Sequence, residues 1–185
     1  LEIKESIRFL RNDVREARLN EVTMALCSEM LIVAGQASDR KDATARCEQA
    51  VSSGKAAEKF AKMVAALGGP RDLLENYESQ LSGAPLVRPL YAQGIVTAVD
   101  ARAVGNSIIE LGGGRRQVGE ALDLSVWFSD IVPIGTELDD NTPLAVIHAA
   151  TEDAADGAEQ NLLAAVSLGD TKPAERPVIC EILTG

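Results

Sequence analysis

The sequence predicts an α+β protein in which a helical segment precedes a module of mixed strands and helices. Up to about residue 80, apolar residues recur every three or four positions, a spacing typical of helices. Further along, short runs rich in β-branched residues are separated by turn residues, which is typical of strands. The composition changes at the Ser-Gly-Ala-Pro stretch 82–85. We therefore expect two parts, 1–83 and 84–185.

Helices are expected throughout the first part. Residues 1–10 mix charged and apolar residues as a surface helix does, and Val22, Leu26, Met30 and Ala34 form the apolar stripe of a helix ending near Gly35. A further helix begins after an N-cap at 38–39 and runs through 51. Apolar residues at 60, 63, 64 and 67 predict the next helix, and a short one follows the proline at 70.

The second part is expected to alternate strands with two helices. Strands are predicted at 86–91, 95–99, 126–132, 144–148 and 177–183. Asp100 is a predicted N-cap for a helix that carries Val104, Ile108 and Leu111 on one face and stops at the glycines 112–114. Apolar residues between 155 and 166 predict the last helix.

Composition excludes several classes of function. The 185 residues carry a formal net charge of −10, nearly all of it beyond residue 83, and only 3% of residues are aromatic. Such a surface repels a phosphate backbone and offers bases nothing to stack on, so no nucleic-acid partner is expected. No apolar run is long enough for a membrane span. The three cysteines form no CxxC pair, which argues against a zinc site and favours a reducing, cytoplasmic location.

The glycine turn at 112–114, followed by Arg115 and Arg116, is the one motif that suggests an anion site. Exposed backbone N–H groups and guanidinium groups both attract phosphate. These glycines follow a helix, however, so they lie at its negative end and open no helix N-terminus. We expect a helix C-cap here.

No catalytic or substrate-binding residue is predicted from the residues themselves. His148 is the only histidine and lies in an apolar strand, where one polar partner is expected and a metal site is not. The paired carboxylates at 139–140 and 152–153 match turn and helix-start chemistry. The serines at 6, 28 and 107 lack both a Gly-x-Ser-x-Gly setting and a partner histidine.

A second pattern resembles half of a biotinyl or lipoyl carrier domain. The stretches 94–96 and 132–147 have the strand and turn pattern of such a sandwich. The carrier function needs a lysine at a hairpin tip, and the sequence has none between Lys62 and Lys172. The alternative left by this pattern is an autonomous, non-catalytic binding or interaction module with a biotinyl/lipoyl-like fold.

Segments spread over nearly the whole chain resemble the thymidine phosphorylase and pyrimidine nucleoside phosphorylase family. They occur in family order at 1–5 (LEIKE), 22–31 (VTMALCSEML), 53–56, 63–66, 75–77, 111–117 (LGGGRRQ) and 143–149 (PLAVIHA). The forms TMALCSEML, GGGRRQ and PLAVIHA favour the thymidine branch. The resemblance implies that 1–83 is the tail of a larger α/β domain, and that 84–185 is the family's C-terminal α+β module, a barrel-sandwich with a hammerhead-like connection.

The resemblance also implies a reaction. Intact members are cytoplasmic homodimers that convert thymidine and phosphate to thymine and 2-deoxyribose 1-phosphate, with phosphate as co-substrate and no organic cofactor. The family's catalytic and substrate-binding residues lie upstream of the motif that begins at Leu1, so we expect this chain to be a C-terminal fragment that is inactive without its N-terminal half. Family members can hold a monovalent cation near the hinge, and the resemblance implies Glu5 as one ligand of an incomplete site.

Overall fold

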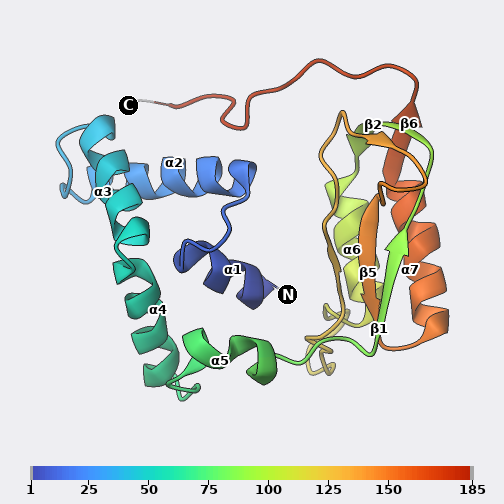
Figure 1. Ribbon diagram of the computed structural model, residues 1–185, viewed down its shortest axis with the longest axis horizontal. Coiled ribbons are helices and arrows are strands. Elements are labelled where there is room, and N and C mark those ends of the chain that lie inside the picture. Colours follow the sequence, from blue (N-terminus) through green and yellow to red (C-terminus); the bar gives the residue numbers. More distant parts are fainter. Residues whose placement is uncertain (1, 184–185) are drawn as a thin grey trace. The chain divides into compact units, whose positions relative to one another are not determined.

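The computed structural model describes residues 2–183, and the chain divides into two compact units (Figure 1). One unit comprises residues 2–81 together with 176–183, and the other comprises Ser82–Glu175. Among the described residues, every element before Leu81 is a helix and every strand lies after it. The predicted α+β class and the change of period near residue 82 are confirmed.

The first unit is built from helices whose ends follow the sequence signals closely. They are α1 (Glu2–Leu10), α2 (Ala17–Val33), α3 (Arg40–Ser52), α4 (Lys55–Ala66) and α5 (Leu73–Gln80). The carboxylate of Asp39 accepts the N–H of Asp42 at 2.8 Å, as predicted for the N-cap of α3. Gly54 separates α3 from α4 with a φ of 77°, a left-handed conformation that favours glycine.

The predicted apolar stripe of α2 is exposed, which corrects the sequence interpretation. Leu26 and Met30 are 60% and 69% exposed, whereas the buried residues of α2 are Met24 and Ser28. Ser28 is buried because its hydroxyl pairs with Thr44 Oγ1 of α3 at 3.0 Å. Periodicity identified the helix correctly but chose the wrong side of it as buried. The side that carries Met24 faces this unit's small core, which also contains Phe9 and Val51.

The second unit contains two small antiparallel sheets. Its strands are β1 (Leu86–Leu90), β2 (Gly94–Val99), β3 (Trp127–Ser129), β4 (Glu137–Leu138), β5 (Ala145–Ala149) and β6 (Val166–Gly169). They form sheets of order β1-β5-β3 and β4-β2-β6. The described strands therefore form two small antiparallel sheets and no closed barrel, where the resemblance implied a barrel-sandwich.

Two helices cover the buried face of the sheet β1-β5-β3. Helix α6 (Ala101–Leu111) packs against α7 (Glu152–Ala165), and α7 also contacts β5 and β1 (Figure 1). Alternation on β5 buries Ala145, Ile147 and Ala149 toward this layer, as expected for a sheet with one covered face. The apolar core of this unit contains residues from both sheets and both helices, so these elements are held together as one module.

One strand prediction and the end of one predicted helix were wrong. No strand forms within the described part of 177–183, because these residues join no sheet edge and belong to the helical unit instead. Val166, expected to end the last helix, instead begins β6, since its backbone pairs with Val99 of β2. No helix within residues 2–183 is long and apolar enough to span a membrane.

Candidate functional site

The glycine turn ends helix α6, as predicted. Gly112 has a φ of 100°, and the N–H groups of Gly112 and Gly113 donate to the carbonyls of Ile109 and Ile108 at 3.1 and 3.0 Å. This geometry caps the orphan carbonyls of a helix C-terminus. The two N–H groups are thus already used within the helix cap, and the phosphate-cradle interpretation loses its donors.

The loop that follows the glycines is organised by an acid. Glu120 Oε2 accepts the backbone N–H of Arg116 at 2.7 Å and that of Gln117 at 3.3 Å. The carboxylate holds two N–H groups that a phosphate would otherwise need, and its charge repels an anion. Arg115 and Arg116 have exposed side chains beside this loop.

His148 lies at the centre of a polar cluster on the open face of the sheet. Its Nε2 is 2.9 Å from Ser129 Oγ, and Ser129 Oγ donates to Asp130 Oδ2 at 2.8 Å. The antiparallel register of β3 and β5 brings these residues together, since Trp127 pairs with His148. The expected single polar partner of His148 is therefore Ser129, which the sequence analysis did not identify. Only the strand register, which is a long-range property, could have revealed it.

The Ser129 hydroxyl has two partners in this cluster. With its proton directed to Asp130 Oδ2, the contact to His148 needs the tautomer that carries Nε2–H. A nucleophilic serine needs the opposite arrangement, in which histidine accepts the serine proton. Burial lowers the pKa of His148, and the charge of Asp130 partly opposes that shift. The arrangement orients the imidazole on the sheet surface, and burial favours its neutral form.

The paired carboxylates have the structural roles that their positions predict. Asp139 Oδ1 accepts the N–H groups of Asn141 and Thr142 at 2.9 and 2.8 Å, and these bonds lower the pKa of Asp139. Glu152 and Asp153 occupy the first turn of α7, where the helix dipole favours negative charge. Neither pair acts as an acid and base couple.

Leu1 marks the point upstream of which the resemblance places the family's catalytic and substrate-binding residues. Leu1 itself lies outside the described residues, which begin at Glu2. The structure therefore does not test where those residues lie, and their position upstream of Leu1 stays a prediction.

Glu5, the residue implied as a cation ligand, is exposed on α1. Among residues 2–183, no group of three or more histidine, cysteine, aspartate or glutamate side chains gathers in a way that could hold a metal ion. Within this part of the chain, Glu5 therefore belongs to no such group. Its role in cation binding stays a prediction.

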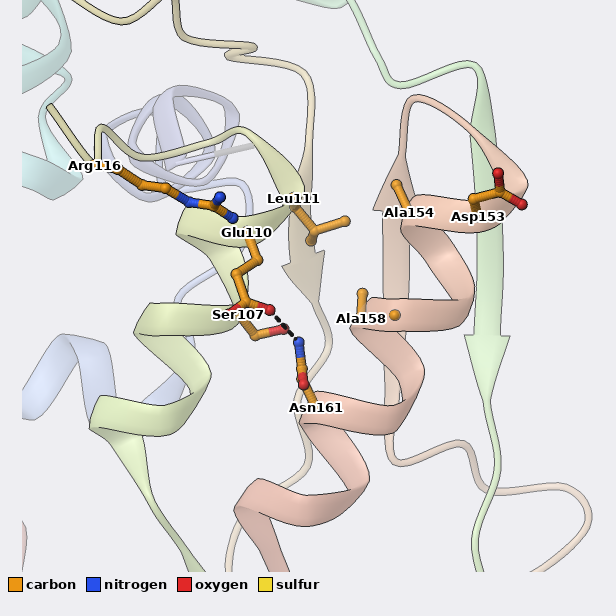
Figure 2. Close-up of a pocket in the computed structure, with 9 residues that line it drawn as sticks. Ser107, Glu110, Leu111, Arg116, Asp153, Ala154, Ala158 and Asn161 are labelled. Atoms are coloured by element: carbon orange, nitrogen blue, oxygen red, sulfur yellow. Dashed lines mark hydrogen bonds between the residues drawn. The ribbon is translucent and has the colours of Figure 1, made fainter.

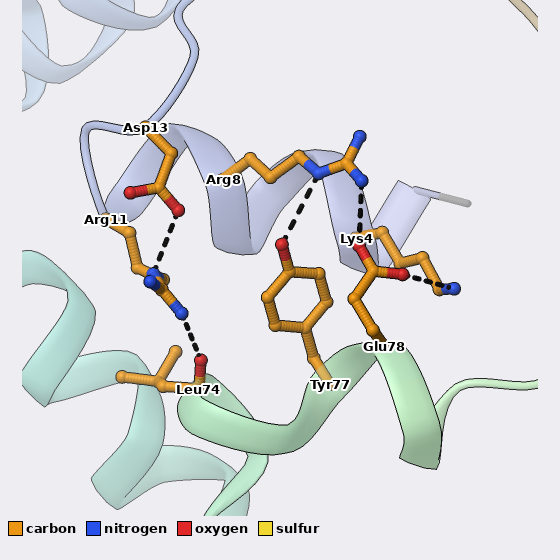
Figure 3. A network of polar contacts seen from close by, with 7 residues as sticks. All are labelled: Lys4, Arg8, Arg11, Asp13, Leu74, Tyr77 and Glu78. Atoms are coloured by element: carbon orange, nitrogen blue, oxygen red, sulfur yellow. Dashed lines mark hydrogen bonds and ion pairs between the residues drawn. The ribbon is translucent and has the colours of Figure 1, made fainter.

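The cationic residues around Glu5 connect α1 to α5 (Figure 3). Lys4 Nζ and Arg8 Nη2 contact the two oxygens of Glu78 at 2.9 and 2.7 Å, and both contacts lower the pKa of that carboxyl. Arg11 Nη1 donates to the carbonyl of Leu74 at 2.6 Å. These contacts hold α1 and α5 together, so the three cationic residues have a structural role.

An apolar surface remains on the helical unit. Besides Leu26 and Met30, Val33 of α2 is 86% exposed, and a groove of about 560 Å³ lies between the α2–α3 pair and the C-terminal residues 178–183. Its lining is mostly aliphatic, with Leu26 on one side and Ile179 and Ile182 on the other. A contiguous apolar surface of this kind is typical of a face that contacts more protein.

Residues 95–169 match the family model described as the pyrimidine nucleoside phosphorylase C-terminal domain. The matched segment begins in β2 and ends in β6, and its first and last residues, Ile95 and Gly169, are partners in the β2–β6 ladder. The match therefore covers the helices and the described strands of this unit apart from β1, and it contains the glycine turn and the His148 cluster. Residues 95–169 are therefore similar to the C-terminal domain of pyrimidine nucleoside phosphorylases.

Proposed function

We propose that this chain forms the C-terminal part of a thymidine phosphorylase and packs against the segment that carries the catalytic residues. The match over 95–169 carries the proposal, because it assigns the module to a nucleoside phosphorylase family. The forms TMALCSEML, GGGRRQ and PLAVIHA at 23–31, 112–117 and 143–149 add the preference for thymidine over other pyrimidine nucleosides.

The exposed face of α2 supports a larger assembly. Leu26, Met30 and Val33 are apolar yet largely exposed, while the buried cluster of this unit is small. An autonomous module would be expected to turn a polar face to water. The proposed partners are an N-terminal catalytic half and a second copy of the complete enzyme in a cytoplasmic homodimer, without nucleic acid or membrane.

The proposed reaction needs cations that this chain does not gather in its C-terminal module. Phosphate attacks the anomeric carbon while the base leaves with negative charge, so catalysis rests on orientation and on cations near phosphate and base. Arg88 contacts carboxylates of α7, the closest being Asp156 Oδ1 at 2.8 Å. Arg115 and Arg116 follow the negative end of α6. The 185-residue chain alone is therefore expected to be inactive.

A chimera tests the proposal. The upstream part of a characterised thymidine phosphorylase, ending just before its Leu-Glu-x-Lys-Glu motif, is joined to residues 1–185. Thymine release from thymidine with phosphate is then measured. The chimera should release thymine, while the chain alone and the upstream part alone should fall below the chimera by about a hundredfold or more.

Two results would contradict the proposal. A correctly folded chimera without phosphorolytic activity would remove the assignment to this reaction and favour the autonomous binding module. Turnover by residues 1–185 alone, within about a hundredfold of the chimera, would show that the chain holds a complete catalytic site. Loss of the chimera's activity in Glu5→Gln, restored by a higher potassium concentration, would support the implied cation site.

A further inference from the structure

A cavity of about 250 Å³ lies between α6 and α7, within the unit Ser82–Glu175 (Figure 2). It is distinct from the glycine cap and from the His148 cluster. Polar groups from both helices and from the loop after α6 line it, namely Ser107, Glu110, Arg116, Asp153 and Asn161.

The cavity exists because α7 turns small residues toward α6. Ala154, Gly157 and Ala158 line it, and a Cβ added to Gly157 would meet no atom within 4 Å. A glycine in a helix interior weakens the helix by about 0.5–1 kcal/mol relative to alanine. At this position it keeps a space open that a larger side chain would fill.

Ser107 is the observation that points to a ligand. Its side chain belongs to a residue that is 2% exposed, and its Oγ has no hydrogen-bond partner among the described residues. A buried polar group without a partner costs about 1–3 kcal/mol, and native proteins rarely leave one without a reason. The hydroxyl borders the cavity and lacks the partner that a bound molecule would supply.

Two further residues with acceptor oxygens line the same cavity. Asn161 Nδ2 donates to Glu110 Oε2 at 2.6 Å, which orients both side chains and leaves Glu110 Oε1 and Asn161 Oδ1 as acceptors. Figure 2 shows Ser107, Glu110 and Asn161 gathered where α6 and α7 meet. An ammonium group has three donors and no acceptor, so it matches such a set of oxygens.

Arg116 supplies the opposite charge. Its exposed side chain borders the same cavity and forms no ion pair with any described residue. A guanidinium binds a carboxylate with two parallel hydrogen bonds. Glu110 and Asp153 outnumber this single cation, so the lining is net negative, which disfavours a phosphate dianion and favours a ligand that carries an ammonium group beside its carboxylate.

We propose that the α6–α7 cavity binds a small zwitterion of the amino-acid class. The ammonium group contacts Ser107, Glu110 and Asn161, and the carboxylate pairs with Arg116. This site is independent of the proposed phosphorolysis and contributes no group to it.

Calorimetric titration of the 185-residue chain tests the chemistry of the ligand. The probes are L-alanine and L-serine, with ethylammonium and propionate as compounds that each lack one of the two charges, and with D-ribose and inorganic phosphate as other classes. Alanine or serine should bind with a dissociation constant of about a millimolar, and each half-ligand should bind about tenfold more weakly or not at all.

Matched variants locate the site. Gly157→Leu fills the cavity and should abolish binding, while Gly105→Leu is the control, because Gly105 is also a helical glycine with no atom within 4 Å of an added Cβ and does not line the cavity. Arg116→Gln changes an exposed residue and should weaken alanine binding about tenfold while leaving ethylammonium binding unchanged. Far-UV circular dichroism verifies that each variant is folded.

Three outcomes overturn the proposal. One is no heat with either amino acid up to about 10 mM, well above the expected dissociation constant. Another is binding of ribose or phosphate in preference to the amino acids. The third is amino-acid binding that survives Gly157→Leu or is unaffected by Arg116→Gln, which would place the ligand elsewhere.

Discussion

At the scale of single residues, the glycine turn is explained by helix termination and close packing. Gly112 has the left-handed conformation that ends α6. Gly113 and Gly114 have no room for a side chain, because an added Cβ would meet atoms of α6. A Cβ on Gly113 would lie 3.0 Å from Ile108 Cγ2, and one on Gly114 would lie 2.5 Å from Ile109 Cγ1. Close packing of the turn against α6 therefore explains the glycines that first suggested an anion site.

Gly114→Ala is expected to destabilise the module by about 1–3 kcal/mol, because the added methyl group forces Ile109 or the turn to move. Urea unfolding followed by the fluorescence of Trp127, the only tryptophan, measures the effect. Gly105→Ala adds the same methyl group in open space and should leave stability unchanged or raise it by up to about 1 kcal/mol. Equal effects of the two substitutions would contradict the packing explanation.

The pKa of His148 is expected to lie below its usual 6.5, because burial disfavours the charged ring. The unfolded chain then binds the proton more tightly, so stability falls as the pH is lowered below 6.5 and recovers above it. Because His148 is the only histidine, its NMR titration can be assigned directly.

Asp130→Asn provides the control for the His148 titration. The charge of Asp130 raises the pKa of His148, so its removal should lower that pKa further. A folded-state pKa at or above 6.5 in the unmodified chain, or a rise in Asp130→Asn, would contradict this account of the cluster.

At the scale of elements, local signals placed the helices, and tertiary contacts chose their faces. The predicted caps Asp39, Asp100 and Gly112 occupy the ends of α3 and α6, with Asp100 Oδ1 accepting the N–H groups of Arg102 and Ala103 at 3.0 Å. Helix α2 also formed as predicted, yet Met30 of its apolar stripe faces outward and Met24 faces inward.

Two identical substitutions test this orientation of α2. Met24→Ala removes a side chain that is 7% exposed and should cost about 2–5 kcal/mol of the free energy of unfolding of the helical unit. Met30→Ala removes one that is 69% exposed and should change it by less than about 0.5 kcal/mol. Far-UV circular dichroism in urea measures both, and a larger loss for Met30 would mean that the predicted stripe faces the core after all.

At the scale of the whole molecule, the apolar core is unevenly divided. The main cluster draws all its buried residues from the unit Ser82–Glu175, whereas the helical unit has only the small cluster around Phe9 and Met24. Buried apolar area is the main source of folding free energy. The two units should therefore differ in their ability to fold alone.

Residues 82–175 expressed separately are expected to fold cooperatively, with a single unfolding transition seen by both Trp127 fluorescence and circular dichroism. Residues 2–81 are the comparison, and their smaller buried cluster should give a broad, weakly cooperative transition. The prediction fails if 82–175 shows broad unfolding or binds hydrophobic dyes as a molten globule does.

The sequence by itself determined the elements that depend on local physics. Helix periodicity, side-chain caps and glycine stops act over a few residues, so they can be seen in the sequence and most were confirmed. The Asp139 turn and the start of α7 belong to the same class, because their partners lie within three residues. The family resemblance came from the order of several such segments and was supported by the match over 95–169.

Tertiary structure decided everything that depends on a distant partner. The residues at 177–183 have the composition of a strand but pair with no strand, and Val166 joins β6 because Val99 is its partner. The pairing of Ser129 with His148 and the cavity bordered by Ser107 likewise need strand register and helix packing. A hydrogen-bond ladder or a cavity is a property of two segments at once, so no single stretch of sequence can specify it.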